Sequence, residues 1–210
     1  SPEATVEQIG ACADLGTELA LVAPPFYYLI SQDEVIRFYE EVAQRTDLPL
    51  VLYNIPHLTK LWIEPSTVAH LVKDPNIIGV KDSSRSFDYT QNLVQLRDSS
   101  GDFSILTGSD TQLVAALTVG ADGAWAASLN VAPELSVGII DAYREGDMER
   151  ARSLQAKLLQ LVSLGRWGTF PAGWKAILDS IGIPAGPPAW PTLPLSPSRK
   201  AELSEQLAKI

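Results

Sequence analysis

The chain has 210 residues, 46% of them hydrophobic and 20% charged, a balance typical of a soluble domain with a sizeable core. Its net charge of -9 argues against nucleic acid and anionic membrane surfaces as partners, because both attract basic faces. The single cysteine, Cys12, and the two histidines, His57 and His70, exclude a disulfide framework and argue against a metal site rich in cysteine or histidine. We expect Cys12 to be a small core residue.

No apolar run approaches the roughly 18 to 20 residues of a membrane span, and no charged-then-apolar signal segment opens the chain. The sequence begins with Ser1 rather than Met, so the lack of a signal segment is weak information. We therefore expect a cytoplasmic protein that acts on a small molecule. An anionic substrate remains open, because local donors rather than net charge decide such binding.

Strands and helices alternate along the first 126 residues. Ser1, Pro2 and Glu3 start a helix that Gly16 ends, since serine caps, proline fits the first turn and glycine stops a helix. Further helices are predicted at 31–45, 65–72, 89–96 and 110–119, and strands at 19–22, 48–52, 77–80, 103–106 and 122–126. The strands are short and almost wholly apolar, which indicates a parallel sheet buried on both faces.

After residue 133 the pattern becomes wholly helical. Helices are predicted at 133–144, 147–164, 170–181 and 196–209, with a loop rich in proline and glycine at 184–194. We therefore divide the chain into residues 1–133, a partial (β/α) barrel that carries the active site, and residues 134–210, a C-terminal barrel helix with a helical extension.

Five parallel strands are too few for a closed barrel, which needs eight strands and about 250 residues. An open doubly wound sheet is the alternative, but no glycine-rich phosphate loop follows any strand. The sequence therefore predicts an α/β fold of the (β/α)8 TIM-barrel type, with the first three strands absent from this chain.

A lysine stands at the end of the third predicted strand, where IIGVKDSS spans residues 77–84 and places Lys81 after an apolar run. Poor solvation of the charged form favours a neutral amine, which attacks carbonyl carbon to give a Schiff base. An ordinary surface lysine is the alternative.

In parallel α/β folds the catalytic residues lie at the carboxyl ends of the strands. The polar and aromatic residues predicted there are Tyr27, Tyr28, Tyr53, Asn54, Lys81 to Ser84, Thr107 to Asp110, Ser128 and Asn130.

Together these motifs resemble the dihydrodipicolinate synthase / N-acetylneuraminate lyase family, and the resemblance covers essentially the whole chain. Enzymes of that family are Schiff-base aldolases built on a (β/α)8 barrel with extra C-terminal helices. The motifs are Tyr53-Asn54-x-Pro56, Gly79-Val80-Lys81, Gly108-x-Asp110 and the segment from Gly120-Ala121-Asp122-Gly123 to Asn130-x-x-Pro133.

The resemblance implies roles for three residues. Lys81 matches the lysine that forms an imine with pyruvate or another 2-oxo acid, so that the chemistry needs no cofactor. Tyr53 matches the tyrosine that carries protons at the imine and at the aldol hydroxyl. Tyr27 falls where the family often places a tyrosine that reaches into a neighbouring subunit, although Phe26 or Tyr28 fits after a one-residue slip. A homodimer or homotetramer is therefore expected.

Four further residues match or face the part of the pocket that holds the aldehyde portion of the substrate. Ser83, Gly108 and Asp110 match lining positions, and Trp125 is expected to narrow the pocket. For Asp110 a second interpretation is equally good, because an aspartate at that place also caps the helix that begins there.

The family's Gly-Thr-Thr-Gly-Glu segment, whose threonines bind the substrate carboxylate, is absent from this sequence. Removal of three strands would leave two long parallel edges unpaired, so we expect these 210 residues alone to be neither stable nor active. By analogy with complete barrels, we predict that the natural protein has roughly 80 to 90 further N-terminal residues.

A second departure concerns the substrate. Family members that make dihydrodipicolinate usually carry an arginine shortly after the Tyr-Asn-x-Pro motif, whereas residues 57–60 read HLTK. Loss of a bidentate carboxylate binder favours cleavage or dehydration of a 2-oxo sugar acid, such as a 2-keto-3-deoxy sugar acid. The alternatives are 4-hydroxy-tetrahydrodipicolinate synthesis in lysine biosynthesis and a non-catalytic relative that binds sugar acids.

Overall fold

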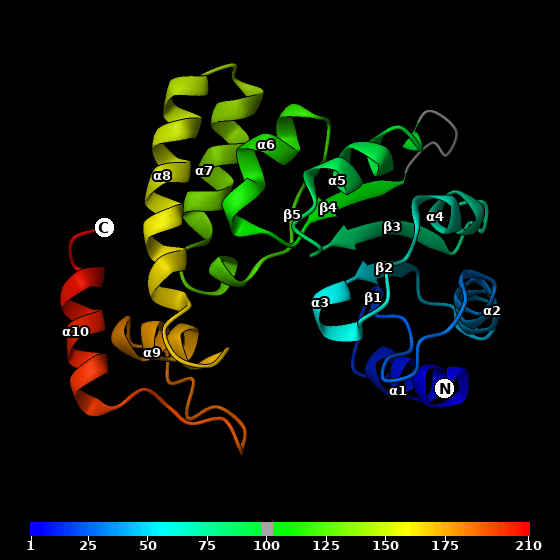
Figure 1. Cartoon of the computed structure of the whole chain (residues 1–210), viewed down its shortest axis with the longest axis horizontal. Coiled ribbons are helices and arrows are strands. Elements are labelled where there is room, and N and C mark those ends of the chain that lie inside the picture. Colours follow the sequence, from blue (N-terminus) through cyan, green and yellow to red (C-terminus); the bar gives the residue numbers. More distant parts are fainter. Residues whose placement is uncertain (98–102) are drawn as a thin grey trace. The chain divides into compact units, whose positions relative to one another are not determined.

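The computed structural model describes residues 1–97 and 103–210 (Figure 1). These residues form two compact units. The first contains Ser1–Ser109 and Thr118–Gly123, and the second contains Asp110–Leu117 and Ala124–Ile210. These two units are defined by how the chain packs. The division at residue 133 was instead predicted from the expected role of each segment, and it stays a prediction.

The strands form one sheet in the order β1-β2-β3-β4-β5, so each strand lies beside its neighbour in sequence. The first four are parallel, as the alternation of strands and helices predicts. The central strands β2 and β3 are buried along almost their whole length. The bounds are β1 Ala20–Val22, β2 Leu50–Asn54, β3 Ile77–Asp82, β4 Ser104–Thr107 and β5 Gly123–Ala124.

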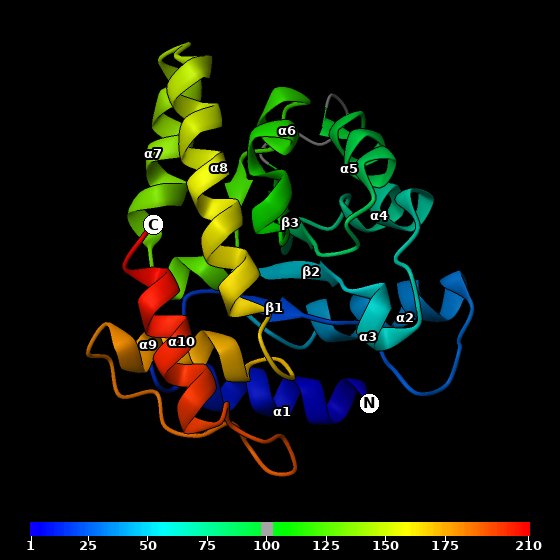
Figure 2. The ribbon, with the colours of Figure 1, turned by 60° about the vertical axis from the view of Figure 1, so that its left-hand side comes forward.

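The helices of the first unit pack in series beside the strands: α1 on α2, α2 on α4 and α4 on α5 (Figures 1 and 2). Ser31 starts α2 with a capping box, in which its hydroxyl accepts from the Glu34 N–H and the Glu34 carboxylate accepts from the Ser31 N–H. The bounds are α1 Pro2–Ala13, α2 Gln32–Ala43, α3 Pro56–Thr59, α4 Pro65–Leu71 and α5 Phe87–Val94.

Helices of the second unit surround their own apolar core, which includes Leu158, Leu161, Trp174 and Ile177. α7 packs along α8, and α9 and α10 pack on α8 and on each other (Figure 2). The four helices predicted after residue 133 are all present. The bounds are η2 Asp110–Gln112, α6 Leu113–Thr118, η3 Ala127–Asn130, α7 Pro133–Arg144, α8 Met148–Gly165, α9 Ala172–Ser180 and α10 Pro197–Leu207.

Several local expectations were wrong. Strand β3 ends at Asp82 rather than at residue 80, because Lys81 and Asp82 pair with both neighbouring strands. Strand β5 has two residues instead of five, and the helix expected from residue 110 opens as the short 3-10 turn η2. Cys12 is exposed, because Ile9 is the only residue of α1 that is buried.

Within residues 1–97 and 103–210, no helix combines the length and the apolar character needed to cross a membrane. The same residues contain no cluster of three or more histidine, cysteine or acidic side chains able to hold a metal ion.

Candidate active site

Lys81 and Tyr53 lie side by side at the carboxyl ends of the two central strands. They are direct partners in the parallel register of β3 and β2. The Lys81 Nζ lies 4.1 Å from the centroid of the Tyr53 ring, over its face. Lys81 is only 9% exposed, and Tyr53 is half-buried. The structure thus brings together the amine and the phenol that the sequence predicted as nucleophile and proton carrier.

The strands themselves produce this arrangement. Val80 and Leu52, the residues before the pair, are fully buried and hold the strand ends in the core. Side chains at paired positions of neighbouring strands point to the same face of the sheet, so an amine and a phenol in register must meet.

Gly108 approaches the Lys81 side chain closely. It follows β4, and its N–H donates to the Asp82 carbonyl at 2.6 Å. A Cβ at Gly108 would collide with the Ser83 Oγ and would stand 3.1 Å from the Lys81 Cε. Glycine is therefore required for close packing at this position. Ser83 is 8% exposed, so Lys81, Ser83 and Gly108 form one tight cluster.

Asp82 was placed among the strand-end residues by the sequence, but no role was predicted for it. Its carboxylate is 3% exposed and accepts from the Asn54 Nδ2 at 2.8 Å. Burial raises the pKa of the Asp82 carboxyl, while hydrogen bonds from Ser84, Asn54 and Thr90 oppose that rise. The sequence did contain a signal for the contact between Asn54 and Asp82. Asn54 directly follows Tyr53 and Asp82 directly follows Lys81, so parallel strands that pair Tyr53 with Lys81 also pair Asn54 with Asp82.

Tyr27 lies in the loop after β1 and is 85% exposed. Its φ of 83° places it in the left-handed region, and its ring meets that of Tyr28 edge-to-face at 5.0 Å. The predicted contact with a neighbouring subunit stays a prediction.

Asp110 and Trp125 belong to the second unit. The Asp110 Oδ1 accepts from the Ser128 N–H at 3.1 Å, and the Asp110 carbonyl accepts from the Gln155 Nε2 at 2.9 Å. Trp125 is 39% exposed. Their predicted contacts with substrate also stay predictions.

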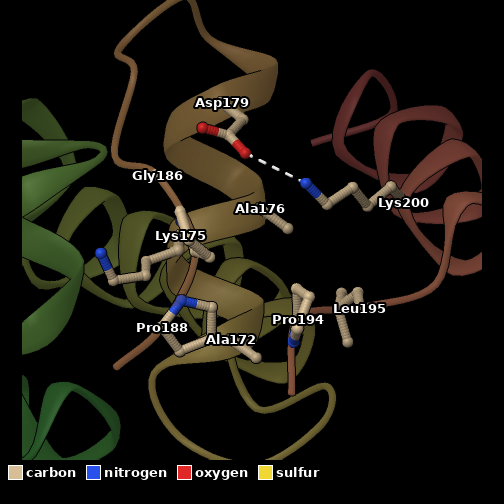
Figure 3. A pocket seen from close by; sticks show the side chains of 10 residues that line it. Ala172, Lys175, Ala176, Asp179, Gly186, Pro188, Pro194, Leu195 and Lys200 are labelled. Atoms are coloured by element: carbon tan, nitrogen blue, oxygen red, sulfur yellow. Dashed lines mark hydrogen bonds and ion pairs between the residues drawn. The ribbon is translucent and has the colours of Figure 1, made fainter. Parts of the chain in front are cut away.

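A cavity of about 260 Å³ lies within the second unit, between α9, α10 and the loop that joins them (Figure 3). Its charged groups are paired with protein groups. The Lys200 Nζ lies 3.2 Å from the Asp179 carboxylate, and the Lys175 Nζ donates to the Ala185 carbonyl at 2.7 Å. These contacts tie α10 and the loop to α9, so the cavity is a poor candidate for catalysis.

Parallel strands alternate with helices in this chain, and Lys81 and Tyr53 lie at the carboxyl edge of the sheet, which is the edge where TIM-barrel enzymes carry their active sites. The profile of the Dihydrodipicolinate synthetase family matches residues 4–210. The chain belongs to this family, as its motifs predicted.

Named relatives divide among several activities. The chain is 36% identical over 200 residues to an uncharacterized DapA-like lyase of Thermofilum pendens, covering 94% of this chain and 65% of that protein. It is 31% identical over 205 residues to a 4-hydroxy-tetrahydrodipicolinate synthase of Methanothrix thermoacetophila, covering 98% and 69%. It is 35% identical over 172 residues to a probable 2-dehydro-3-deoxy-D-pentonate aldolase of Escherichia coli K12, covering 80% and 57%. The matched part of the chain thus spans between 57% and 69% of the length of these relatives.

Solved structures agree on the fold. The whole chain superimposes, with a TM-score of 0.93 and 32% identity, on 72% of YagE. YagE is a prophage protein of the dihydrodipicolinic acid synthase family from E. coli K12, solved in complex with pyruvate. The five strands and following helices therefore correspond to the greater part of such a barrel.

Proposed function

We propose that this protein is a Schiff-base-forming lyase that acts on 2-oxo acids and releases or consumes pyruvate. The observation that carries the proposal is the buried Lys81 amine, 4.1 Å from the ring centroid of Tyr53 at the carboxyl edge of the sheet. Membership of the family, whose named relatives are lyases, aldolases and synthases, supports it.

The first step is formation of an imine. The Lys81 nitrogen attacks the keto carbon, so that a C–N bond forms and the π bond of the carbonyl breaks; the nitrogen loses one proton and the carbonyl oxygen takes up one. The resulting carbinolamine loses that hydroxyl as water and gives the imine. The Tyr53 phenol supplies and recovers the protons of these transfers. The covalent link to Lys81 takes the place of a cofactor.

Cleavage follows when the substrate carries a hydroxyl at C4. The proton of that hydroxyl passes to Tyr53, the C3–C4 bond breaks, and its electron pair moves into the imine to give an enamine. The aldehyde leaves, the enamine takes up a proton at C3, and water hydrolyses the imine to pyruvate and free Lys81.

The remaining predicted residues are assigned to substrate binding. Ser83 and Gly108 pack beside Lys81 and suit the wall of the reaction pocket. Asp110 and Trp125 are proposed to face the aldehyde portion. Tyr27 is proposed to complete the proton relay of a neighbouring subunit in a homodimer or homotetramer, and its 85% exposure leaves it available for such a contact.

A 2-keto-3-deoxy sugar acid is the proposed substrate class. The absence of an arginine in HLTK, residues 57–60, removes the expected binder of a second carboxylate. The relative named as a pentonate aldolase supports this choice. Synthesis of 4-hydroxy-tetrahydrodipicolinate is the second candidate activity, because other relatives are named as synthases of that compound.

Reductive trapping tests the proposal. The full-length protein is incubated with pyruvate and borohydride, digested, and analysed by mass spectrometry. We expect the mass of one reduced pyruvyl group on the peptide that contains Lys81. An unmodified Lys81, or an adduct only on a solvent-exposed lysine such as Lys73, would sink the proposal.

A second assay distinguishes the substrates. Pyruvate release is measured over a panel of 2-keto-3-deoxy sugar acids, and condensation of pyruvate with aspartate semialdehyde is measured in parallel. Release from a sugar acid with no condensation supports the proposal, whereas the reverse supports the synthase. Trapping without turnover of either kind would indicate a binding protein. We also propose a cytoplasmic location, which cell fractionation tests.

A further inference from the structure

A second buried pair lies directly behind Tyr53 and Lys81. Asn54 and Asp82, the next residues of β2 and β3, are also partners in the register. Successive residues of a strand point to opposite faces, so this pair projects away from the reacting pair. Asn54 is fully buried and Asp82 is 3% exposed, and the Asn54 Nδ2 donates to the Asp82 Oδ1 at 2.8 Å.

The Asp82 carboxylate gathers several more donors. Its Oδ1 accepts from the Ser84 N–H at 2.9 Å, and its Oδ2 accepts from the Ser84 Oγ at 2.9 Å and the Thr90 Oγ1 at 3.4 Å. On the other side, the Asn54 Oδ1 accepts from the Ile63 N–H at 3.1 Å. A buried carboxylate costs free energy unless it is well hydrogen-bonded, and this one ties β2, β3 and the start of α5 together.

The backbone around Asp82 extends the same connection to the Lys81 side chain. The Asp82 carbonyl accepts from the Gly108 N–H at 2.6 Å, and the Ser83 N–H donates to the Asn54 carbonyl at 2.8 Å. Ser83 and Gly108 are the residues that pack closely beside Lys81. A shift of Asp82 would therefore move both the strand that holds the lysine and the walls beside it.

We propose that Asp82, together with Asn54, is a positioning residue that holds Lys81 in the orientation needed for imine formation. This inference rests on the proposed function, in which Lys81 is the nucleophile. Asparagine at position 82 would keep the size but not the pattern of acceptors. Its NH2 group cannot accept a hydrogen bond. Placed at Oδ1 it would meet the N–H donors of Asn54 and Ser84. Placed at Oδ2 it would require the Ser84 and Thr90 hydroxyls to turn and accept, so that the bonds to a charged carboxylate that hold the end of β3 are lost.

The test measures the rate of borohydride trapping of pyruvate by the full-length protein at several pyruvate concentrations. Because a displacement of about 1 Å costs up to roughly 100-fold in rate, we expect Asp82→Asn to lower the maximal trapping rate by about 10- to 100-fold. The pyruvate concentration for half-maximal trapping should stay close to that of the wild type, since the Asp82 side chain points to the face of the sheet opposite that of Lys81 and Tyr53. The exchange Asn54→Asp with Asp82→Asn restores one carboxylate facing one amide, and should recover part of the lost rate.

A matched control separates positioning from stability. Leu93→Ala opens a cavity in α5, beyond Thr90 on the same helix, and should lower the unfolding temperature without changing the trapping rate at a temperature where the protein stays folded. If Asp82→Asn does not fold, Ser84→Ala removes one donor and should lower the rate several-fold. An unchanged rate in the variant that folds would overturn the role of Asp82, as would an equal loss of rate in Leu93→Ala. Absence of trapping in the wild type would instead overturn the proposed function, and the role of Asp82 with it.

Discussion

Lys81 at the end of β3 and Lys200 beside the cavity of the second unit are two lysines in different surroundings. Lys81 is 9% exposed and lies over the ring of Tyr53. The Lys200 side chain is 43% exposed and forms an ion pair with Asp179 at 3.2 Å (Figure 3). Lys200 lines a cavity, whereas Lys81 is distinguished by its burial and by its register opposite Tyr53. The comparison teaches that the neighbours of a lysine, rather than the hollow beside it, indicate its chemistry.

The largest expected effect comes from removing the Lys81 amine. Lys81→Met keeps an unbranched apolar side chain in a buried position, and it should lower pyruvate release by roughly a thousandfold or more, because no imine can form. Lys200→Met is the matched control and should retain the wild-type rate. The comparison would be broken if Lys81→Met kept more than a small fraction of the activity, or if Lys200→Met lost it.

Tyr53→Phe separates the ring from its hydroxyl. The phenyl ring keeps the surface over which the Lys81 Nζ lies, while the proton carrier is removed. We expect pyruvate release to fall by about 100- to 10,000-fold, the usual contribution of general acid–base catalysis. Tyr28→Phe, on an exposed loop, is the control and should have little effect on the rate. A Tyr53→Phe variant with normal turnover would show that the ring only packs against the lysine.

Much of the fold followed from hydrophobic periodicity. The parallel order of strands and the helices after residue 133 were predicted because apolar runs and glycine or proline stops are local signals. The end of β3 was not predicted, because lysine and aspartate are poor strand formers. Pairing with β2 and β4 keeps them in the sheet, at Tyr53, Asn54, Leu106 and Thr107.

The candidate site was predictable to the same extent. Lys81 and Tyr53 follow apolar runs, so the rule that strand ends carry the chemistry identified both. Asp82 was placed at the same strand end but was given no role, because an acidic residue after a strand is typical of a turn and its partners Asn54 and Thr90 are set by tertiary packing. The roles of Tyr27, Asp110 and Trp125 depend on contacts with substrate or with another subunit, and they stay predictions.

Gly108→Ala should have an intermediate effect. The added methyl group would meet the Ser83 Oγ and press on the Lys81 Cε, in a region where the chain is buried. We expect a loss of about 1 to 3 kcal/mol in the free energy of unfolding, together with slower trapping of pyruvate. Gly10→Ala is the control, because nothing lies within 4 Å of its added Cβ in the middle of α1. That change should raise stability by up to about 1 kcal/mol. Denaturant unfolding and the trapping assay check both variants, and normal trapping by Gly108→Ala would show that the contact is not needed.

The smallest effect is expected where Lys200 meets Asp179. Both side chains are more than one third exposed, so water and salt screen their attraction. Asp179→Asn should therefore change the free energy of unfolding by less than about 1 kcal/mol and should leave pyruvate trapping unchanged. The remaining difference from the wild type should shrink as salt is added, which denaturant titrations at low and high ionic strength measure. A loss of trapping in Asp179→Asn would show that the surroundings of Lys200 affect the chemistry of Lys81, and the contrast drawn between the two lysines would then be wrong.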